Sequence, residues 1–200
     1  MKRYDIINHF INSRGYFSFL EIGTAGGETY RNVMAPVKVS VDPDPTTNPT
    51  FCGTSDEFFE WNFQCYDIIF IDGLHEHNQV YRDIHTALQV LERGGVIVLH
   101  DCLPTSKKMQ EHKMTSQYGY AWTGDVWKAF VKERSKSPFL MYTVDTDFGC
   151  GVIDTAYEVV WDDRGDVRAG LPSDMETMTY EQFVQNRNNW MNVKGEIING

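Results

Sequence analysis

Four short apolar runs, each ending at or beside an acidic residue, constrain the fold of this chain more than any other feature. Turn residues bound each run, which is typical of strands that are buried on both faces. The segments between the runs space apolar residues along one helix face, as Val80, Ile84, Leu88 and Leu91 do before a helix stop predicted at Gly94. Strands that alternate with helices predict a parallel sheet covered by crossover helices. The predicted strands are residues 17–22, 37–41, 66–71 and 96–99.

The 200-residue chain is the size of one domain, and no repeat or low-complexity tract divides it. We expect an N-terminal helix in residues 1–15, a core in residues 16–155 and a C-terminal extension in residues 156–200. Residues 102–121 form a polar connection whose length predicts a functional segment that is mobile without substrate. The predicted helices are residues 3–13, 27–35, 54–62, 77–93, 124–135 and 179–193, and two further strands are residues 140–144 and 150–153. The helix that begins at Thr54 resembles a capped helix, and Thr179 to Gln182 has the form of a capping box.

Acidic residues outnumber basic ones by 28 to 18, which gives a formal net charge of −10. This balance argues against sequence-independent binding to nucleic acid or to an anionic membrane. Residues 1–15 hold no signal-peptide core, and no apolar run approaches the roughly 20 residues that span a bilayer. The four cysteines form no CxxC pair, as expected of free thiols in a reducing compartment. We therefore expect a cytoplasmic protein with a small-molecule substrate and with neither nucleic acid nor a membrane as partner, while the oligomeric state stays open.

A glycine-rich turn follows the first predicted strand, at Gly23, Gly26 and Gly27. Glycines let the backbone approach a ligand, and the helix that follows adds unpaired N–H groups. The turn does not fit the dinucleotide fingerprint, because its second and third glycines would fall at Ala25 and Glu28. A nicotinamide oxidoreductase is therefore a weak interpretation, and a purely structural loop is an equal alternative for the turn taken alone.

Asp42 ends the second predicted strand, about 20 residues after the glycine turn. An acidic side chain at this place can accept hydrogen bonds from both hydroxyls of a ribose. A turn-forming aspartate before Pro43 is the structural alternative. Together, the turn and Asp42 at this spacing predict nucleoside binding.

Two further strand ends carry titratable side chains, in Asp72-Gly73-Leu74-His75 and in His100-Asp101-Cys102. In an open parallel sheet, ligands bind outside the carboxyl ends of the strands. Glu21, Asp42, Asp72 and Asp101 should therefore meet at one edge of the sheet.

The order of these motifs resembles the class I S-adenosylmethionine (SAM)-dependent methyltransferases. The motifs are strand-Glu-x-Gly-x-x-Gly, strand-Asp, Thr-Ser-Asp-Glu-Phe-Phe, Ile-Asp-Gly-Leu-His and His-Asp-Cys. Within that class, residues 17–155 are most similar to the methyltransferase domain 24 group. The resemblance implies a Rossmann-like, doubly wound α/β fold with helices on both faces. Its sheet would be mostly parallel and seven-stranded, with the last strand antiparallel.

The same resemblance implies SAM as cofactor and assigns its contacts. The turn from Glu21 to Gly27 would hold the methionine part, Asp42 the ribose, and Ser55 with Asp56 the side of the adenine. The implied cofactor-binding residues are Glu21, Gly23, Thr24, Ala25, Gly26, Gly27, Asp42, Ser55, Asp56 and Asp72.

Asp72 and Asp101 correspond by resemblance to the two acidic metal ligands of catechol-type O-methyltransferases. The lysine base of those enzymes is replaced here by His75, and their third oxygen ligand by Cys102. Two carboxylates suit Mg²⁺, which would lower the pKa of an acceptor hydroxyl, and His75 titrates in the range useful for a base. Asp72 and His75 are therefore the catalytic candidates, and His100 either joins Asp72 and Asp101 as a metal ligand or orients Asp101. Structural alternatives are a turn cap for Asp72 and a supporting hydrogen bond for His75.

The favoured function is SAM-dependent methylation of a small molecule, with a hydroxyl oxygen as acceptor and a divalent metal as one means of activating it. A non-catalytic nucleoside-binding module is one alternative. A nucleic-acid methyltransferase is another, although the chain lacks the Asn/Asp-Pro-Pro-aromatic signature and a Pro-Cys dipeptide. Solvated or packing roles are expected of four further residues, His77, His85, His112 and Trp122.

Overall fold

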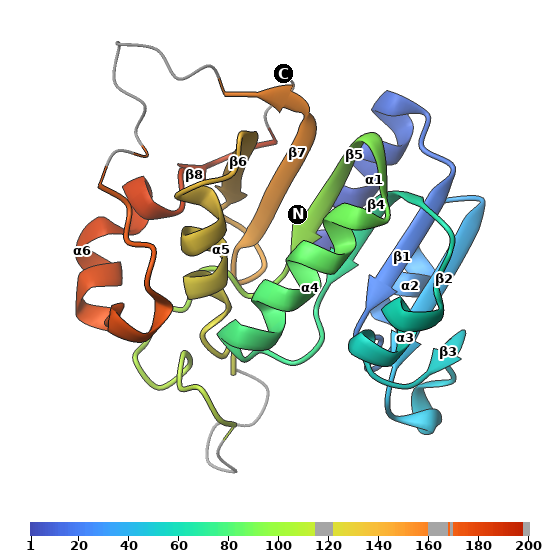
Figure 1. Cartoon of the computed structure of the whole chain (residues 1–200), viewed down its shortest axis with the longest axis horizontal. Coiled ribbons are helices and arrows are strands. Elements are labelled where there is room, and N and C mark those ends of the chain that lie inside the picture. The colour runs from blue at the N-terminus through green and yellow to red at the C-terminus, as the bar shows by residue number, and fades with distance from the viewer. Residues whose placement is uncertain (115–121, 160–167, 169, 198–200) are drawn as a thin grey trace.

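An eight-stranded sheet crosses the computed structural model, which describes residues 1–114, 122–159, 168 and 170–197 (Figure 1). The strand order is β3-β2-β1-β4-β5-β7-β6-β8. The strands are β1 (Ser18–Ile22), β2 (Val37–Asp42), β3 (Phe51–Cys52), β4 (Tyr66–Ile71), β5 (Leu91–Leu99), β6 (Phe139–Val144), β7 (Cys150–Glu158) and β8 (Val193–Lys194).

Strands β3, β2, β1, β4 and β5 are parallel, and β7 runs antiparallel to both β5 and β6. This arrangement confirms the mixed α/β fold with a mostly parallel sheet. The prediction of seven strands was wrong by one. Two strands lie outside the predicted strand ranges: β3, which pairs with β2, and β8, which pairs with the outer edge of β6 where the last helix was predicted to end.

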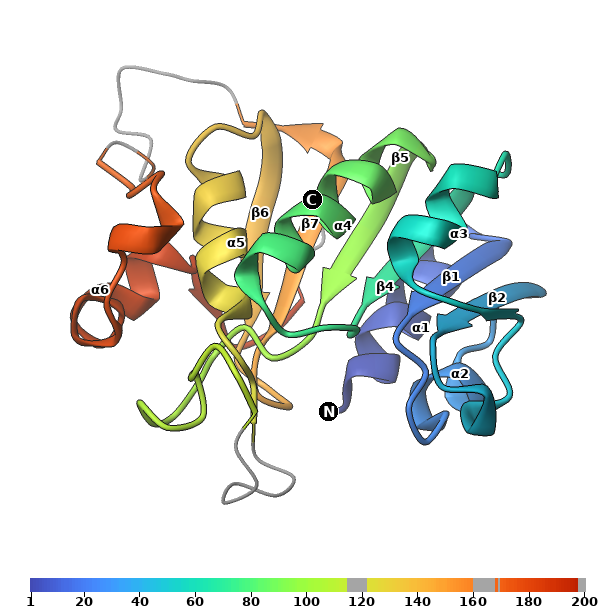
Figure 2. The ribbon, with the colours of Figure 1, turned by 60° about the horizontal axis from the view of Figure 1, so that its bottom comes forward.

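Helices cover both faces of the sheet (Figures 1 and 2). Side chains alternate between the faces along each strand, so Phe19 and Ile68 pack on one side and Leu20 and Ile69 on the other. Apolar residues of α1 fill the first side, and those of α3, α4, α5 and α6 fill the second. The helices are α1 (Arg3–Arg14), α2 (Glu28–Asn32), α3 (Ser55–Trp61), α4 (His77–Gln89), α5 (Val126–Arg134) and α6 (Tyr180–Trp190), with 3₁₀ turns η1 (Pro45–Thr47) and η2 (Met175–Thr177).

Three predicted helices end three or four residues earlier in the structure, among them α6, which ends at Trp190. Helix α2 ends at Asn32 because Val33 has extended backbone angles, four residues before β2 starts. Helix α4 ends at Gln89, and Leu91, predicted to lie on its apolar face, instead begins β5 and pairs with Tyr66. Gly94 therefore lies inside a strand and does not end the helix.

The predicted capping residues are in place. Thr54 accepts the backbone N–H of Glu57 at the start of α3, and Thr179 accepts that of Gln182 at the start of α6. In the described ranges, no helix combines the length and apolarity needed to cross a membrane.

The long connection predicted over residues 102–121 is described up to Met114, and residues 115–121 lie outside the described part of the chain. Met109 is buried, and its carbonyl accepts the backbone N–H groups of Thr123 and Gly124. The two described ends of the connection therefore lie against each other. Mobility of this segment and the predicted domain boundaries stay predictions.

Candidate active site

The carboxyl ends of β1, β2, β4 and β5 meet at one edge of the sheet. Ile22 aligns with Val41 on one side and with Ile71 on the other, and Ile71 aligns with Leu99. Because the strands end level, the residues that follow each of them lie side by side. The sheet thus brings together the glycine turn and the three aspartates that the sequence places after the strands.

Gly23 makes the close crossing between the β1 turn and the end of β4 possible. Its φ is +88°, and a Cβ atom there would lie 2.1 Å from the backbone oxygen of Asp72. The Gly23 N–H donates to Val41, and the Asp72 N–H donates to Ile22. A side chain at this position would therefore force two strand ends apart.

Asp42 organises the glycine turn. Its Oδ2 accepts the backbone N–H groups of Thr24 (2.8 Å) and Ala25 (3.0 Å), and its Oδ1 accepts that of Asp44 (2.9 Å). Asp42 therefore has the turn-forming role that the sequence analysis gave as its structural alternative. This role does not exclude a ligand, because a carboxylate has further lone pairs and Asp42 also lines a cavity.

A cavity of about 380 Å³ opens beside the turn, within the size range of small-molecule sites. Of the predicted cofactor-binding residues, Gly23, Ala25, Asp42, Ser55, Asp56 and Asp72 line it. The other four, Glu21, Thr24, Gly26 and Gly27, do not.

Two of those four residues carry buried polar atoms without a partner among the described residues, Glu21 Oε2 and Thr24 Oγ1. Burial, and secondarily the Asp72 carboxylate, raises the pKa of Glu21 to about 8. Buried polar atoms are normally hydrogen-bonded, so these two atoms mark a place where a polar ligand or water belongs.

Ser55 and Asp56, which were predicted to lie beside the adenine, are held by side chains of α4 that the sequence analysis did not single out. Ser55 is buried and donates to Asp83 Oδ1 (2.7 Å). The Gln79 amide donates to Ser55, Asp56 and Asp83 at 2.9–3.2 Å. Gln79 and Asp83 lie one helical turn apart on α4, a spacing that could have suggested a shared role.

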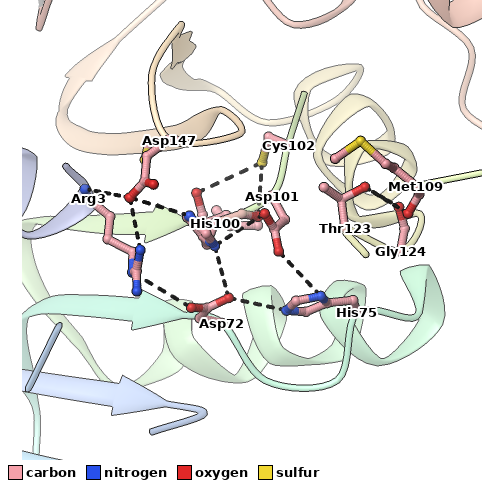
Figure 3. Close-up of polar contacts among 12 residues, drawn as sticks. Arg3, Asp72, His75, His100, Asp101, Cys102, Met109, Thr123, Gly124 and Asp147 are labelled. Carbon is pink, nitrogen blue, oxygen red and sulfur yellow. Dashed lines mark hydrogen bonds and ion pairs between the residues drawn. The ribbon is translucent and has the colours of Figure 1, made fainter. Parts of the chain in front are cut away.

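Figure 3 shows a cluster that we call the acid–imidazole cluster, formed by Arg3, Asp72, His75, His100, Asp101 and Asp147. Asp72 Oδ1 lies 3.2 Å from both His75 Nε2 and His100 Nδ1. Asp101 approaches the same two rings, with 3.4 Å from Oδ2 to His75 Nδ1 and 3.3 Å from Oδ1 to His100 Nδ1. Asp72, His75 and Asp101 each offer a ligand atom within 4.8 Å of the others, so they could share a metal ion.

Charge in this cluster is balanced by imidazoles. Burial disfavours the charged form of His100, but the neighbouring carboxylates, Asp72 foremost, outweigh burial and raise the pKa of His100. The pKa of His75 is likewise raised, by Asp72 against the effect of burial. Burial would raise the pKa of Asp72, but the two histidines hold it below its usual range. The partly exposed Asp72 and the buried His100 therefore form an ion pair.

Cys102 supplies no ligand to this cluster. It is fully buried in the apolar core, its Sγ lies 3.7 Å from the backbone oxygen of His100, and burial raises the pKa of its thiol. Asp101, just before it, has a φ of +59°, a left-handed conformation that aspartate tolerates better than most residues. The backbone turns sharply there, and the Asp101 carboxylate faces His75 (Figure 3).

A second cavity, of about 440 Å³, adjoins the first at the Asp72–His100 pair. Asp72 lines the first cavity, whereas His100 and Asp101 line the second. The wall of the second cavity combines charged and polar side chains with apolar ones; besides His100 and Asp101 it is formed by Lys2, Arg3, Glu28, Thr123 and Asp147, and by Met109, Trp122 and Phe148.

Sequence reasoning missed Arg3 and Asp147. Arg3, from α1, donates to Asp147 Oδ2 (2.9 Å) and lies 4.0 Å from Asp72 Oδ2. Asp147, between β6 and β7, lies 3.7 Å from His100 Nε2, and the cations of His100 and Arg3 lower its pKa. The two residues are 144 positions apart in the sequence.

Trp122, predicted as a packing residue, stacks on the His75 ring with centroids 5.1 Å apart. Gly124, with a φ of +58°, lets this segment reach His75, because a Cβ there would lie 2.0 Å from the His75 backbone oxygen. The packing role of Trp122 thus places it at the site itself.

Comparison with known proteins gives a consistent result. Residues 43–102 match the model of a family described as a methyltransferase domain. No curated protein matches the sequence.

Solved structures share the fold at low sequence identity. The O-methyltransferase TomG of Streptomyces achromogenes, involved in tomaymycin synthesis and solved with SAM, is 13% identical with a TM-score of 0.57, over 76% of this chain and 78% of that one. The methyltransferase PaMTH1 of Podospora anserina, bound to SAH, is 13% identical with a TM-score of 0.59, over 76% and 77%. An O-methyltransferase of Bacillus cereus in complex with SAH is 14% identical with a TM-score of 0.54, over 76% and 80%. The resemblance predicted from the sequence is confirmed: this chain has the fold of class I SAM-dependent methyltransferases, and residues 43–102 match a methyltransferase-domain family.

Proposed function

We propose that this protein is a SAM-dependent methyltransferase that acts on a hydroxyl oxygen of a small polar molecule. The observation that carries the proposal is the pair of cavities that adjoin at Asp72 and His100. One cavity has the features of a nucleoside site, and the other has charged and polar wall residues suited to an acceptor. A direct displacement requires that the methyl donor and the methyl acceptor are held next to each other, and two adjoining cavities can do this.

The first cavity fits SAM. Asp42, on the cavity wall, would meet the ribose hydroxyls. The unpartnered atoms of Glu21 and Thr24 lie at the adjoining glycine turn, outside the cavity lining. When bound, SAM supplies a methyl group on a positively charged sulfur. The carboxylates of Asp42, Asp56 and Asp72 make this cavity favourable for a cationic ligand.

His75 is the proposed base. The acceptor oxygen would take the methyl group, so that the S–CH₃ bond breaks as the O–CH₃ bond forms and S-adenosylhomocysteine is the leaving group. The proton of the acceptor O–H would pass to an imidazole nitrogen of His75. The neighbouring carboxylates stabilise the resulting imidazolium, which is why the pKa of His75 is raised. Because the neutral ring is the active form, we expect the rate to increase as pH rises through that pKa.

A divalent metal is a second means of activating the hydroxyl. Asp72 and Asp101, with His75 or His100, would hold it, and a bound ion would lower the pKa of the acceptor hydroxyl. Two carboxylates fit Mg²⁺, whereas added imidazoles fit Mn²⁺ or Fe²⁺ better. The metal and His75 as base compete for the same atoms, so the two means can be separated by experiment. A cytoplasmic location and the absence of nucleic-acid and membrane partners stay predictions.

Calorimetric titration with SAM and with S-adenosylhomocysteine tests the first step. We expect micromolar binding of both, at least about tenfold weaker in Asp42→Ala, because that change removes the ribose acceptor and frees the turn. Asp44→Ala is the matched control, since the Asp44 side chain bonds to Thr46 and does not line the cavity. Absence of binding to folded wild-type protein would refute the proposal.

Methyl transfer to a panel of hydroxylated acceptors, with Mg²⁺ or with chelator, tests the second step. Loss of activity in chelator and in Asp101→Asn would support the metal. Activity that survives chelator but falls at least a hundredfold in His75→Gln would support the base. Cofactor binding without turnover on any acceptor, in either condition, would favour the non-catalytic module.

A further inference from the structure

A second group of side chains that could hold a metal ion lies next to the candidate active site. We call it the His77 cluster: His77 at the start of α4, His112 in the connection after β5, and Asp125 directly before α5, with Glu76 and Glu176 around them. None of these residues lines either cavity, and none has a part in the proposed methyl transfer. The sequence assigned His77 and His112 only packing or solvated roles.

The inner atoms of the cluster converge on the Asp125 carboxylate. His77 Nδ1 lies 2.6 Å from Asp125 Oδ2, and His112 Nδ1 lies 3.3 Å from the same oxygen. Two ligands of a tetrahedral ion with bonds of about 2.0–2.1 Å are about 3.3 Å apart, so the His112–Asp125 spacing already fits. The His77–Asp125 pair is hydrogen-bonded and would separate by about 0.7 Å when an ion replaces its proton.

The outer nitrogen of each ring meets a carboxylate of its own. His77 Nε2 lies 3.1 Å from Glu176 Oε1, and His112 Nε2 lies 3.5 Å from Glu76 Oε2. Histidines that bind metals usually direct the other ring nitrogen to a carboxylate, which fixes the ring and increases its basicity. This arrangement occurs twice here, independently of the spacing of the inner atoms.

Burial and donor chemistry define the class of ion. His77 and Asp125 are buried, whereas the His112 side chain is 42% exposed and leaves one side open to solvent. Two imidazoles and one carboxylate suit Zn²⁺ and its transition-metal neighbours, whereas Mg²⁺ prefers oxygen ligands alone. Lys128 Nζ, 3.6 Å from Asp125 Oδ2, is a cation that would compete with the ion.

We propose that His77, His112 and Asp125 bind a Zn²⁺-class ion that ties the connection after β5 to the starts of α4 and α5. The ion would act on structure rather than on the reacting atoms. The Asp125 N–H donates to the backbone oxygen of His75, and His77 is two positions from His75. Fixing this cluster would therefore fix the backbone of the proposed base.

Titration of the metal-free full chain with Co²⁺ tests the proposal, since Co²⁺ bound by four ligands absorbs visible light intensely. We expect this signal in wild type, its displacement by one equivalent of Zn²⁺, and an affinity at least about tenfold weaker in His112→Ala. His85→Ala is the matched control, because His85 is a half-exposed histidine of α4 whose ion pair is with Glu133. Lys128→Gln should strengthen binding severalfold by removing the competing cation.

The acid–imidazole cluster is a competing location for the ion, and Asp101→Asn separates the two. Retention of the Co²⁺ signal in Asp101→Asn with loss in His112→Ala supports the proposal. Loss in Asp101→Asn with retention in His112→Ala would assign the ion to the acid–imidazole cluster and overturn it. Equal affinity of wild type and His112→Ala would overturn it as well. None of these readouts requires methyl transfer.

Discussion

Single residues at the sheet edge combine two demands, close backbone packing and buried charge. Gly23 allows the close packing, because only a residue without Cβ fits against the Asp72 backbone. His100 neutralises the buried charge, because its cation lies between carboxylates that would otherwise repel one another. Both demands come from contacts between strand ends, so each residue acts on parts of the chain that are distant in sequence.

Alanine substitutions at three glycines should separate the cost of a steric collision of the new Cβ atom from the cost of a strained backbone angle. Gly23→Ala combines a positive φ with a 2.1 Å collision, and we expect it to lower the free energy of unfolding by about 3 kcal/mol or more. Gly15→Ala has a φ of +67° but open space, and should cost about 1 kcal/mol. Gly26→Ala has neither problem and should change stability by less than about 0.5 kcal/mol. Urea unfolding of the three variants measures this order, and equal costs for Gly23 and Gly15 would contradict the collision.

Glu21→Gln should change how stability depends on pH. The pKa of Glu21 is about 8 in the folded protein against a model-compound value of 4.5, so the folded state holds a proton that the unfolded state releases between these values. The contribution of Glu21 to stability is thus complete below about pH 4.5 and is lost as pH rises toward 8. Relative to Glu21→Gln, the wild type should lose roughly 2 kcal/mol of its free energy of unfolding between pH 5 and pH 8, which is less than the full difference in pKa would give. Parallel stability curves for the two proteins would exclude a buried, protonated Glu21.

At the scale of elements, α1 is fixed to the sheet at both ends. Arg14 at its C-terminal end forms two hydrogen bonds with the fully buried Asp154 of β7, at 2.8 and 2.5 Å. Arg3 at its N-terminal end contacts Asp147. Apolar residues between them fill the core beneath, so the two ion pairs set the position of the helix on the sheet.

Arg14→Ala should therefore destabilise the protein strongly, by about 3 kcal/mol, because it leaves the buried Asp154 carboxylate without its cation. The comparison is Arg187→Ala, which removes a 2.8 Å pair with the half-exposed Asp145 and should cost less than about 1 kcal/mol. Thermal and urea unfolding of the two variants provide the measurement. A cost for Arg14→Ala as small as that for Arg187→Ala would show that α1 is held by apolar packing alone.

Sequence patterns predicted those helices and strands that depend on residues close together in the chain. Short apolar runs bounded by turn residues located β1, β2 and β4, and the capping patterns at Thr54 and Thr179 located two helix starts. The end of α4 was misplaced because Leu91 fits a helix face equally well, and only its pairing with Tyr66 makes it a strand residue. Strand β8 has two residues and exists only through its pairing with β6, so no pattern within it could reveal it.

The residues of the candidate site likewise fall into two groups, those that the sequence predicted and those that it did not. The strand-end acids were predictable because the carboxyl edge of a parallel sheet gathers them whatever their distance in sequence. Arg3, Asp147 and the His77 cluster were not, because each depends on how two loops or a helix end approach that edge. Sequence spacing carries no information on such approaches when the partners are dozens of residues apart.

At the scale of the whole molecule, the sheet is continuous from β3 to β8, but its two halves are built differently. The parallel half supplies the proposed cofactor cavity, and the segments that follow β5 close the second cavity. Variation in the second half of the chain can therefore change the acceptor while leaving the cofactor cavity intact.

The 144-residue separation between Arg3 and Asp147 has a consequence for how the protein forms on the ribosome. Strands β1, β2 and β4 can pair soon after they emerge, but the acid–imidazole cluster stays open until β6 and the residues after it have been made. At roughly 5–20 residues per second, several seconds pass between the emergence of its first and last members. During that interval Asp72 and His100 lack Asp147 and Arg3 lacks its main partner, so the nascent chain is expected to bind no acceptor until synthesis is almost complete.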